Sequence, residues 1–116
     1  MARRSLIAIS LLILFACAAD AHAILTSSLP GPKQVIKGPE VAVKLTFNSR
    51  IDAKRSRLIL VRPDRSENPL TIGDQPSPEV LTSAAKDLKS GAYVLRWQVL
   101  AHDGHISRGE IPFSVQ

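Results

Sequence analysis

Three histidines, at positions 22, 102 and 105, are the residues of this 116-residue chain best suited to bind a metal. Asp103 and His105 stand two residues apart, so in an extended segment their side chains project to the same face. His102 projects to the opposite face, which predicts an exposed residue or one that supports the ligands from outside. Gly104 lets the backbone or a ligand approach closely. The alternative interpretation is a simple turn at Asp103-Gly104, with His105 a polar loop residue.

The significance of His22 depends on the first 21 residues, which have the pattern of a secretory signal peptide. Two arginines precede an almost wholly apolar run over residues 6–15, and Ala19-Asp20-Ala21 has small residues at both positions that a signal peptidase reads. The apolar run is too short to span a bilayer as a helix, which takes about 20 residues. We therefore expect a signal peptide at 1–21 and one domain at 22–116.

A competing interpretation of the leader is a lipoprotein signal. Leu14-Phe15-Ala16-Cys17 resembles a lipobox, in which Cys17 would become a lipidated N-terminus and His22 would stay internal. Phe15 is bulky where that signal usually has a smaller residue, so the sequence favours cleavage just before His22. Either route exports the protein.

A histidine at the N-terminus offers a metal two donors, its α-amine and its imidazole. With the Asp103 carboxylate and the His105 imidazole, the predicted donor set has three nitrogens and one oxygen. This set suits the tetragonal geometry of copper(II), which also heads the affinity series of divalent metals. Zinc could use the same donors, but it prefers a tetrahedron.

Composition excludes several other chemistries. Met1 and Cys17 hold the only sulfur atoms of the chain, and both leave with the predicted leader. The mature domain therefore lacks the means for a disulfide framework, an iron–sulfur cluster, a thiolate zinc site, a cysteine nucleophile or a thioether copper(I) site. No phosphate-binding glycine loop, serine nucleophile signature or acid–base carboxylate pair stands out.

The predicted domain is basic, with a net charge of +4 once the two arginines and one aspartate of the leader are removed. Its basic cluster lacks the interleaved stacking aromatics that single-stranded nucleic acid requires. We therefore expect no nucleic-acid partner and a solvated, solubilising end of the domain. The cluster consists of Arg50, Lys54, Arg55, Arg57, Arg62 and Arg65.

The segments that must position the candidate ligands alternate apolar and polar residues, as half-buried β-strands do. No segment beyond the leader has a sustained helical period, and Pro and Gly fall between the alternating runs. About seven short strands in one domain predict an all-β, immunoglobulin-like antiparallel sandwich with Greek-key connections. The predicted strands are 23–29, 41–47, 57–62, 70–72, 80–84, 93–100 and 110–115.

Two aromatic residues and one proline refine this prediction. Tyr93 follows the turn-forming segment 88–92, as the tyrosine corner of immunoglobulin-like folds does. Tyr93 and Trp97 are both expected in the core. Pro112 cannot donate to a sheet ladder, which predicts an edge position or a bulge in the last strand.

Motifs over the whole predicted domain follow one family pattern. The start, HAILTSSLP (22–30), matches the pattern HAxLxxSxP, and VKLTF (43–47) matches a following LxF strand. LKSGAYVLRW (88–97), AHDGHISRG (101–109) and FSV (113–115) match LxxGxYxVxW, SxDGHxxxG and FxV. In this order the motifs resemble CopC, a family of periplasmic copper-binding and copper-resistance proteins.

The resemblance implies a β-sandwich in which the α-amine and ring of His22, with Asp103 and His105, hold one copper(II) per chain. It also implies a periplasmic carrier or buffer in copper homeostasis, resistance or import, beside an inner-membrane copper transporter of the CopD type. Some members carry a methionine-rich copper(I) segment that this domain lacks, so no copper(I) site is expected. Ala101 stands where the DGH block usually has serine, and His102 occupies its variable position.

A second function class is a small copper redox enzyme, because a copper held by an N-terminal histidine brace resembles the centre of lytic polysaccharide monooxygenases. Those enzymes need a broad, usually aromatic-rich substrate surface. The domain has only Tyr93, Trp97 and two phenylalanines, all predicted core, and the Asp103 carboxylate fills a position that an oxidase would keep open. The sequence therefore favours a non-enzymatic carrier.

Overall fold

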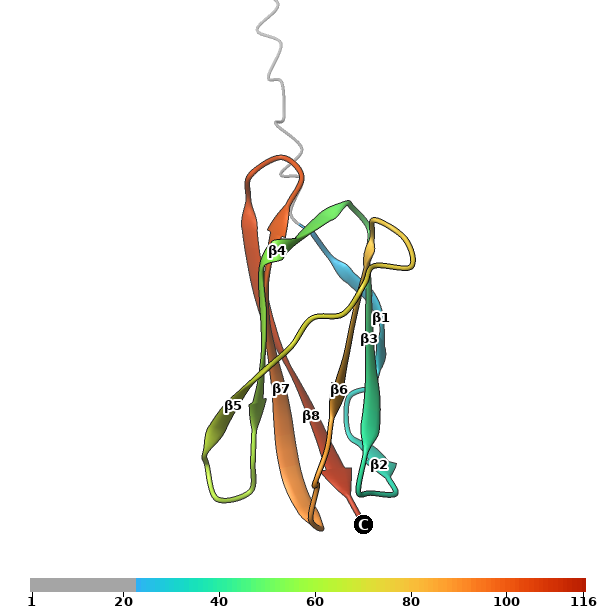
Figure 1. Cartoon of the computed structure of the whole chain (residues 1–116), viewed down its shortest axis with the longest axis vertical. Helices are drawn as coiled ribbons and strands as arrows, with labels where there is room; N and C mark the ends of the chain where they lie inside the picture. The colour runs from blue at the N-terminus through green and yellow to red at the C-terminus, as the bar shows by residue number, and fades with distance from the viewer. Residues whose placement is uncertain (1–22) are drawn as a thin grey trace, which may run out of the picture.

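A computed structural model of the chain describes residues 23–116, which form two β-sheets packed face to face (Figure 1). The predicted signal peptide, residues 1–21, and His22 lie outside the described residues. Residues 23–116 contain no helix of a length and apolarity that could cross a membrane. The strands are β1 (Leu25–Leu29), β2 (Gln34–Ile36), β3 (Val41–Phe47), β4 (Ile51–Val61), β5 (Glu67–Leu70), β6 (Val80–Ala85), β7 (Gly91–Ala101) and β8 (Ile106–Val115).

The predicted all-β, immunoglobulin-like sandwich is confirmed, with two corrections. One sheet has the order β1-β3-β6 and the other β2-β8-β7-β4-β5, so the described residues form eight strands where about seven were expected. The additional strand is β2, whose three residues are too few to show an alternating pattern. It pairs in parallel with β8, whereas every other strand pair of the described sheets is antiparallel.

The expected strand at 70–72 was placed too late in the chain. The structure has β5 at residues 67–70, with Pro69 inside it and opposite Ile59 of β4. Proline usually interrupts a strand because it has no N–H to donate to the ladder. β5 is an edge strand, so a proline whose nitrogen faces the open side of the sheet does not cost a ladder hydrogen bond.

The core lies between the two sheets and is built from the inward residues of the alternating strands. Val43, Leu45 and Phe47 of β3 are buried, and Leu95 and Val99 of β7 face them. Each fully buried aliphatic side chain of this size stabilises the fold by roughly 1.5–3 kcal/mol. The core therefore holds the sandwich together without any of the candidate metal ligands.

The predicted tyrosine corner is confirmed. Tyr93 is buried and its hydroxyl donates to the Lys89 carbonyl at 2.8 Å. Trp97 is only half-buried, and its ring lies edge-on against Phe47 with centroids 5.3 Å apart. The ring also covers Gly109, its neighbour across the β7–β8 ladder, where a Cβ would stand 2.3 Å from a ring carbon.

Pro112 lies inside β8, between β7 and the line of β2. Its carbonyl accepts a hydrogen bond from the Lys33 N–H at 2.6 Å, and β2 pairs only from Phe113 onward. β8 is an interior strand without a bulge at Pro112, so the expected edge position or bulge is wrong. The proline is tolerated because the β2 ladder begins only at Phe113, so no ladder bond needs its missing N–H.

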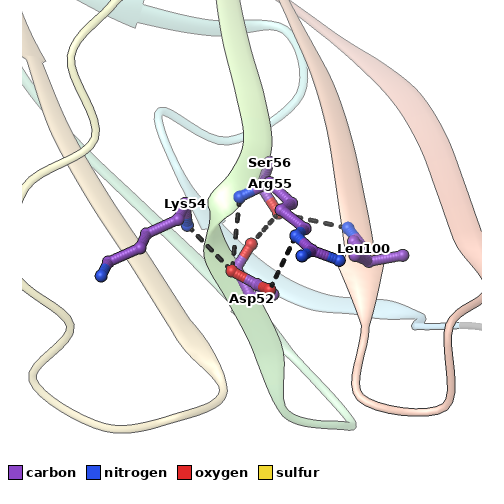
Figure 2. A network of polar contacts seen from close by, with 5 residues as sticks. All are labelled: Asp52, Lys54, Arg55, Ser56 and Leu100. Carbon is purple, nitrogen blue, oxygen red and sulfur yellow. Dashed lines mark hydrogen bonds and ion pairs between the residues drawn. The ribbon is translucent and has the colours of Figure 1, made fainter.

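A bulge interrupts the pairing of β4 with β7. Asp52 pairs with Leu100 and Arg57 with Gln98, so the four residues 53–56 stand opposite one residue of β7. Figure 2 shows how side chains close this gap. The Ser56 hydroxyl donates to the Asp52 carbonyl at 2.6 Å and accepts the Leu100 N–H at 3.2 Å.

Candidate metal centre

The segment 102–105 is the loop of the β7–β8 hairpin, at one end of the sandwich (Figure 1). The Ala101 N–H donates to the His105 carbonyl at 2.8 Å, and the Gly104 N–H donates to the Ala101 carbonyl at 2.9 Å. Gly104 has a φ of 89°, a conformation that glycine adopts without strain. A Cβ at Gly104 would meet nothing within 4 Å, so this position needs glycine for its backbone angle and not for close approach.

Asp103 and His105 are brought together by this turn. The Asp103 Oδ1 accepts the backbone N–H of His105 at 3.0 Å, and Oδ2 lies 3.0 Å from the His105 Nδ1. The sequence predicted their proximity from an extended segment, but the physical cause is an aspartate-stabilised turn. Both the turn and the juxtaposed side chains are present, although they were expected as alternatives.

The electrostatics of this pair favour an ionised carboxylate. The pKa of Asp103 is lowered first by the hydrogen bond from the His105 backbone and then by its side chain. The Asp103 side chain is 31% exposed and that of His105 is 53% exposed. An anionic oxygen and an imidazole nitrogen therefore stand together at the surface, where an ion from solvent can reach them.

Their spacing also fits a metal with neighbouring ligands at right angles. Two donors that each lie about 2.0 Å from such an ion stand about 2.8 Å apart. The 3.0 Å between the Asp103 Oδ2 and the His105 Nδ1 is close to this separation. An ion bound by both side chains would replace the hydrogen bond that now joins them.

The start of the described chain is anchored at the same end of the sandwich. Ala23 is buried in the core, and the Ile24 N–H donates to the Asn48 Oδ1 at 2.8 Å. The Asn48 N–H donates in return to the Ile24 carbonyl at 3.0 Å. The residue after His22 is therefore a core residue, and the next one is held by the loop between β3 and β4.

That β3–β4 loop also contacts the hairpin loop. The His102 N–H donates to the Arg50 carbonyl at 2.9 Å, and Arg50 is two residues beyond Asn48. Two hydrogen-bonded contacts thus connect Ile24 to the segment that carries Asp103 and His105. The His102 side chain is exposed, as predicted.

The described residues bring together two of the predicted ligands, Asp103 and His105. The third, His22, lies outside them, and residues 23–116 contain no group of three or more His, Cys, Asp or Glu side chains that could hold a metal ion. Sequence reasoning missed Asn48 and Arg50, which act through an amide and a backbone carbonyl. An asparagine directly after a strand was the only local signal, and it is typical of any turn.

Comparison with known proteins places the chain among relatives of one kind. The model of the CopC domain matches residues 25–116. Protein YobA of Escherichia coli K12 is 29% identical over 100 residues, which cover 83% of this chain and 80% of YobA.

Solved structures agree with this match. The crystal structure of CopC from Methylosinus trichosporium OB3b is 28% identical, has a TM-score of 0.72, and is matched over 82% of this chain and 94% of that one. PcoC, a methionine-rich copper resistance protein from Escherichia coli, is 23% identical with a TM-score of 0.64, over 83% of this chain and all of that one; this likeness shows the shared fold. Because the family pattern covers all eight strands and the DGH turn of residues 103–105, the chain belongs to the CopC domain family.

Proposed function

We propose that the chain is an exported copper(II)-binding protein that carries or buffers copper in the periplasm. Cleavage after Ala21 frees the His22 α-amine, and this amine, the His22 ring, His105 and Asp103 bind one copper(II). The observation that carries the proposal is the juxtaposition of Asp103 and His105 in an exposed turn, linked through Arg50 and Asn48 to Ile24.

The reach of the chain supports a place for His22 in this site. His22 immediately precedes Ala23, a residue buried in the core. The two anchoring contacts at Ile24 and His102 belong to one loop, so the N-terminus and the hairpin loop leave the sandwich as neighbours. We propose that His22, once freed at the residue before Ala23, offers its amine and its ring to the ion held at Asp103.

The arrangement supports a carrier in preference to a redox enzyme. Phe47, Tyr93 and Phe113 are buried, and the half-buried Trp97 ring packs over Gly109 and against Phe47. These residues are unavailable as an aromatic platform for a polysaccharide. We propose that copper is passed to a membrane transporter of the CopD type and is not used for catalysis.

The experiment is a competition titration of copper(II) into three forms of the protein. The forms are residues 22–116 with a free amine, the same chain acetylated at His22, and the precursor that retains residues 1–21. Blocking the amine removes one donor and the chelate ring, so both blocked forms should bind at least about tenfold more weakly. Equal affinities with equal circular dichroism would refute the proposed site, and copper-dependent oxygen consumption with ascorbate would refute the carrier.

A further inference from the structure

A small apolar surface lies on the outer face of the five-stranded sheet, next to the candidate metal centre. Leu100 and Ile106 are paired directly across the β7–β8 ladder, so their side chains share one face. Val99 and Ala101 are buried, which turns Leu100 outward. Ile106 follows His105 immediately and is 50% exposed, so its side chain is accessible beside the candidate metal centre.

Arginines surround this apolar pair. Arg57 and Arg108 flank Gln98 in the next row of the same face, where the Arg108 Nε donates to the Gln98 Oε1 at 2.8 Å. On the other side, a cleft of about 310 Å³ opens between the start of β4 and the hairpin loop. Its lining includes Arg50, Arg55, Leu100, His102 and Gly104.

One arginine of this rim, Arg55, is paired with a carboxylate, that of Asp52. Among residues 23–116, the others, Arg50, Arg57 and Arg108, form no ion pair. Asp52 is the carboxylate of the cleft; it accepts the backbone N–H groups of Lys54 and Arg55 and forms an ion pair with the Arg55 Nε at 3.9 Å (Figure 2).

The same face is neutralised farther from the metal end. Arg96 pairs there with Glu67 at 2.6 Å and with Glu110 at 3.3 Å. The excess positive charge is therefore local to the row that adjoins Leu100 and Ile106. A solubilising charge would not need this uneven distribution.

We infer that this surface, Leu100 and Ile106 with Arg50, Arg57 and Arg108, docks an acidic segment of a partner protein that also presents an apolar side chain. An apolar centre with a charged rim is the usual anatomy of a protein interface, and complementary charge accelerates encounter. Carboxylates of the partner meet the arginines, while its apolar side chain covers Ile106. The inference rests on the proposed function for its use, since a partner seated here stands beside His105 and can receive the metal.

The test uses the protein of residues 22–116 and a synthetic peptide of about 12 residues, long enough to cross the surface at about 3.3 Å per residue. The peptide alternates pairs of glutamates with leucine, and a control peptide has lysine in place of glutamate. Backbone amide shifts of the protein should move at Arg57, Leu100, Ile106 and Arg108 with the acidic peptide alone. Binding should weaken strongly from about 20 to about 150 mM salt.

Matched charge variants separate this surface from net charge. The double variant Arg57→Gln and Arg108→Gln should bind the acidic peptide with an affinity about tenfold lower than the wild type. Lys86→Gln with Lys89→Gln removes the same charge from the connection between β6 and β7, which lies at the opposite end of the sandwich (Figure 1), and should leave binding unchanged. Ile106→Ser tests the apolar centre without a change of charge and should also weaken binding.

Each contrary outcome overturns the inference. Equal weakening by both double variants would mean non-specific attraction. If the wild-type protein fails to bind the acidic peptide but binds phosphatidylglycerol vesicles, and the first double variant loses this vesicle binding, the surface belongs to a membrane contact. Dimerisation that disappears in the same variant would assign it to a second copy. Copper(II) titration of the wild type and all variants tests the proposed function separately from the docking surface. Peptide binding without copper binding would refute the proposed function and leave the docking inference standing.

Discussion

Asn48 and Ile24 hold each other through two hydrogen bonds, at 2.8 Å to the Asn48 Oδ1 and at 3.0 Å to the Ile24 carbonyl. The first needs the asparagine side chain, whereas the second is a backbone bond. Asn48 therefore controls how firmly the chain after His22 is held, although it is not itself a predicted ligand.

Asn48→Ala is expected to lower copper(II) affinity by about tenfold, because the terminus loses its side-chain anchor while the donors remain. The free energy of unfolding should fall by only about 1 kcal/mol, the typical contribution of one hydrogen bond. Asn48→Asp keeps the accepting oxygen and should retain most of the affinity. Competition titration and urea unfolding measure the two quantities, and unchanged affinity in the alanine variant contradicts the anchoring role.

His105→Ala is expected to weaken copper(II) binding by at least about tenfold, since it removes a ligand. His102→Ala is the matched control from the same loop. The backbone N–H of His102 makes the bond to Arg50 and survives the change, so affinity should be almost unaltered. A reversed order of the two effects would assign the site to the wrong histidine.

The proposed site should distinguish copper(II) from copper(I). The proposed donors are nitrogens and a carboxylate, with no thiolate or thioether in residues 22–116. One copper(II) should bind per chain, and copper(I) should bind weakly, because soft sulfur ligands select that ion. An anaerobic titration under reducing conditions against a copper(I) chelator tests this, and tight stoichiometric binding of copper(I) would contradict the donor set.

The depressed pKa of Asp103 predicts a pH dependence of the metal-free hairpin. The His105 backbone N–H, followed by its side chain, favours the ionised carboxyl. A lowered folded-state pKa contributes stability that is complete above the unfolded value, about 3.9, and is lost as pH falls through the folded value. Carbon-detected NMR titration should therefore place the Asp103 midpoint below that of an unfolded reference peptide.

Copper affinity should respond in a higher range of pH. The α-amine must release its proton and the imidazoles must be neutral to bind, so affinity should fall steadily from about pH 8 to about pH 5. Asp103 stays ionised throughout this range because its pKa is lowered. A flat affinity profile over these values would argue against amine and imidazole ligation.

Ser56→Ala should destabilise the fold by about 1–2 kcal/mol, because the Leu100 N–H loses its partner at the bulge. Ser66→Ala removes another serine hydroxyl, one that donates to Asp64 on an exposed turn, and serves as the control with a smaller effect. Urea unfolding compares the two variants. Equal losses would mean that the bulge network contributes nothing beyond an ordinary surface contact.

The long strands could be predicted because their alternation is set by burial on one face. Residues 41–47 alternate without a break, and the predicted limits agree with β3. The start of β4 was missed because a bulge at residues 53–56 separates its first two residues from the rest of the strand, and side chains of Asp52 and Ser56 replace ladder bonds there. Hydrogen bonds made by side chains at a bulge do not produce an alternating pattern of apolar and polar residues, so the sequence does not reveal them.

The candidate site could be predicted in part for a similar reason. Asp103 and His105 are close in sequence, so local spacing was enough to pair them. The anchoring of Ile24 by Asn48 joins residues 24 positions apart, and the bond from His102 to Arg50 depends on how the loops meet. These contacts follow from the topology of the sandwich, which no short motif contains.

The placement of Trp97 gives the molecule its own optical reporter. It is the single tryptophan of the chain, and its ring touches Phe47, the residue directly before Asn48. It lies four positions before Ala101 at the hairpin loop, a span of about 13 Å along β7. Paramagnetic copper(II) at Asp103 should quench its emission, and unfolding should shift that emission to the red. One unlabelled sample can therefore report metal occupancy and folding through the same side chain.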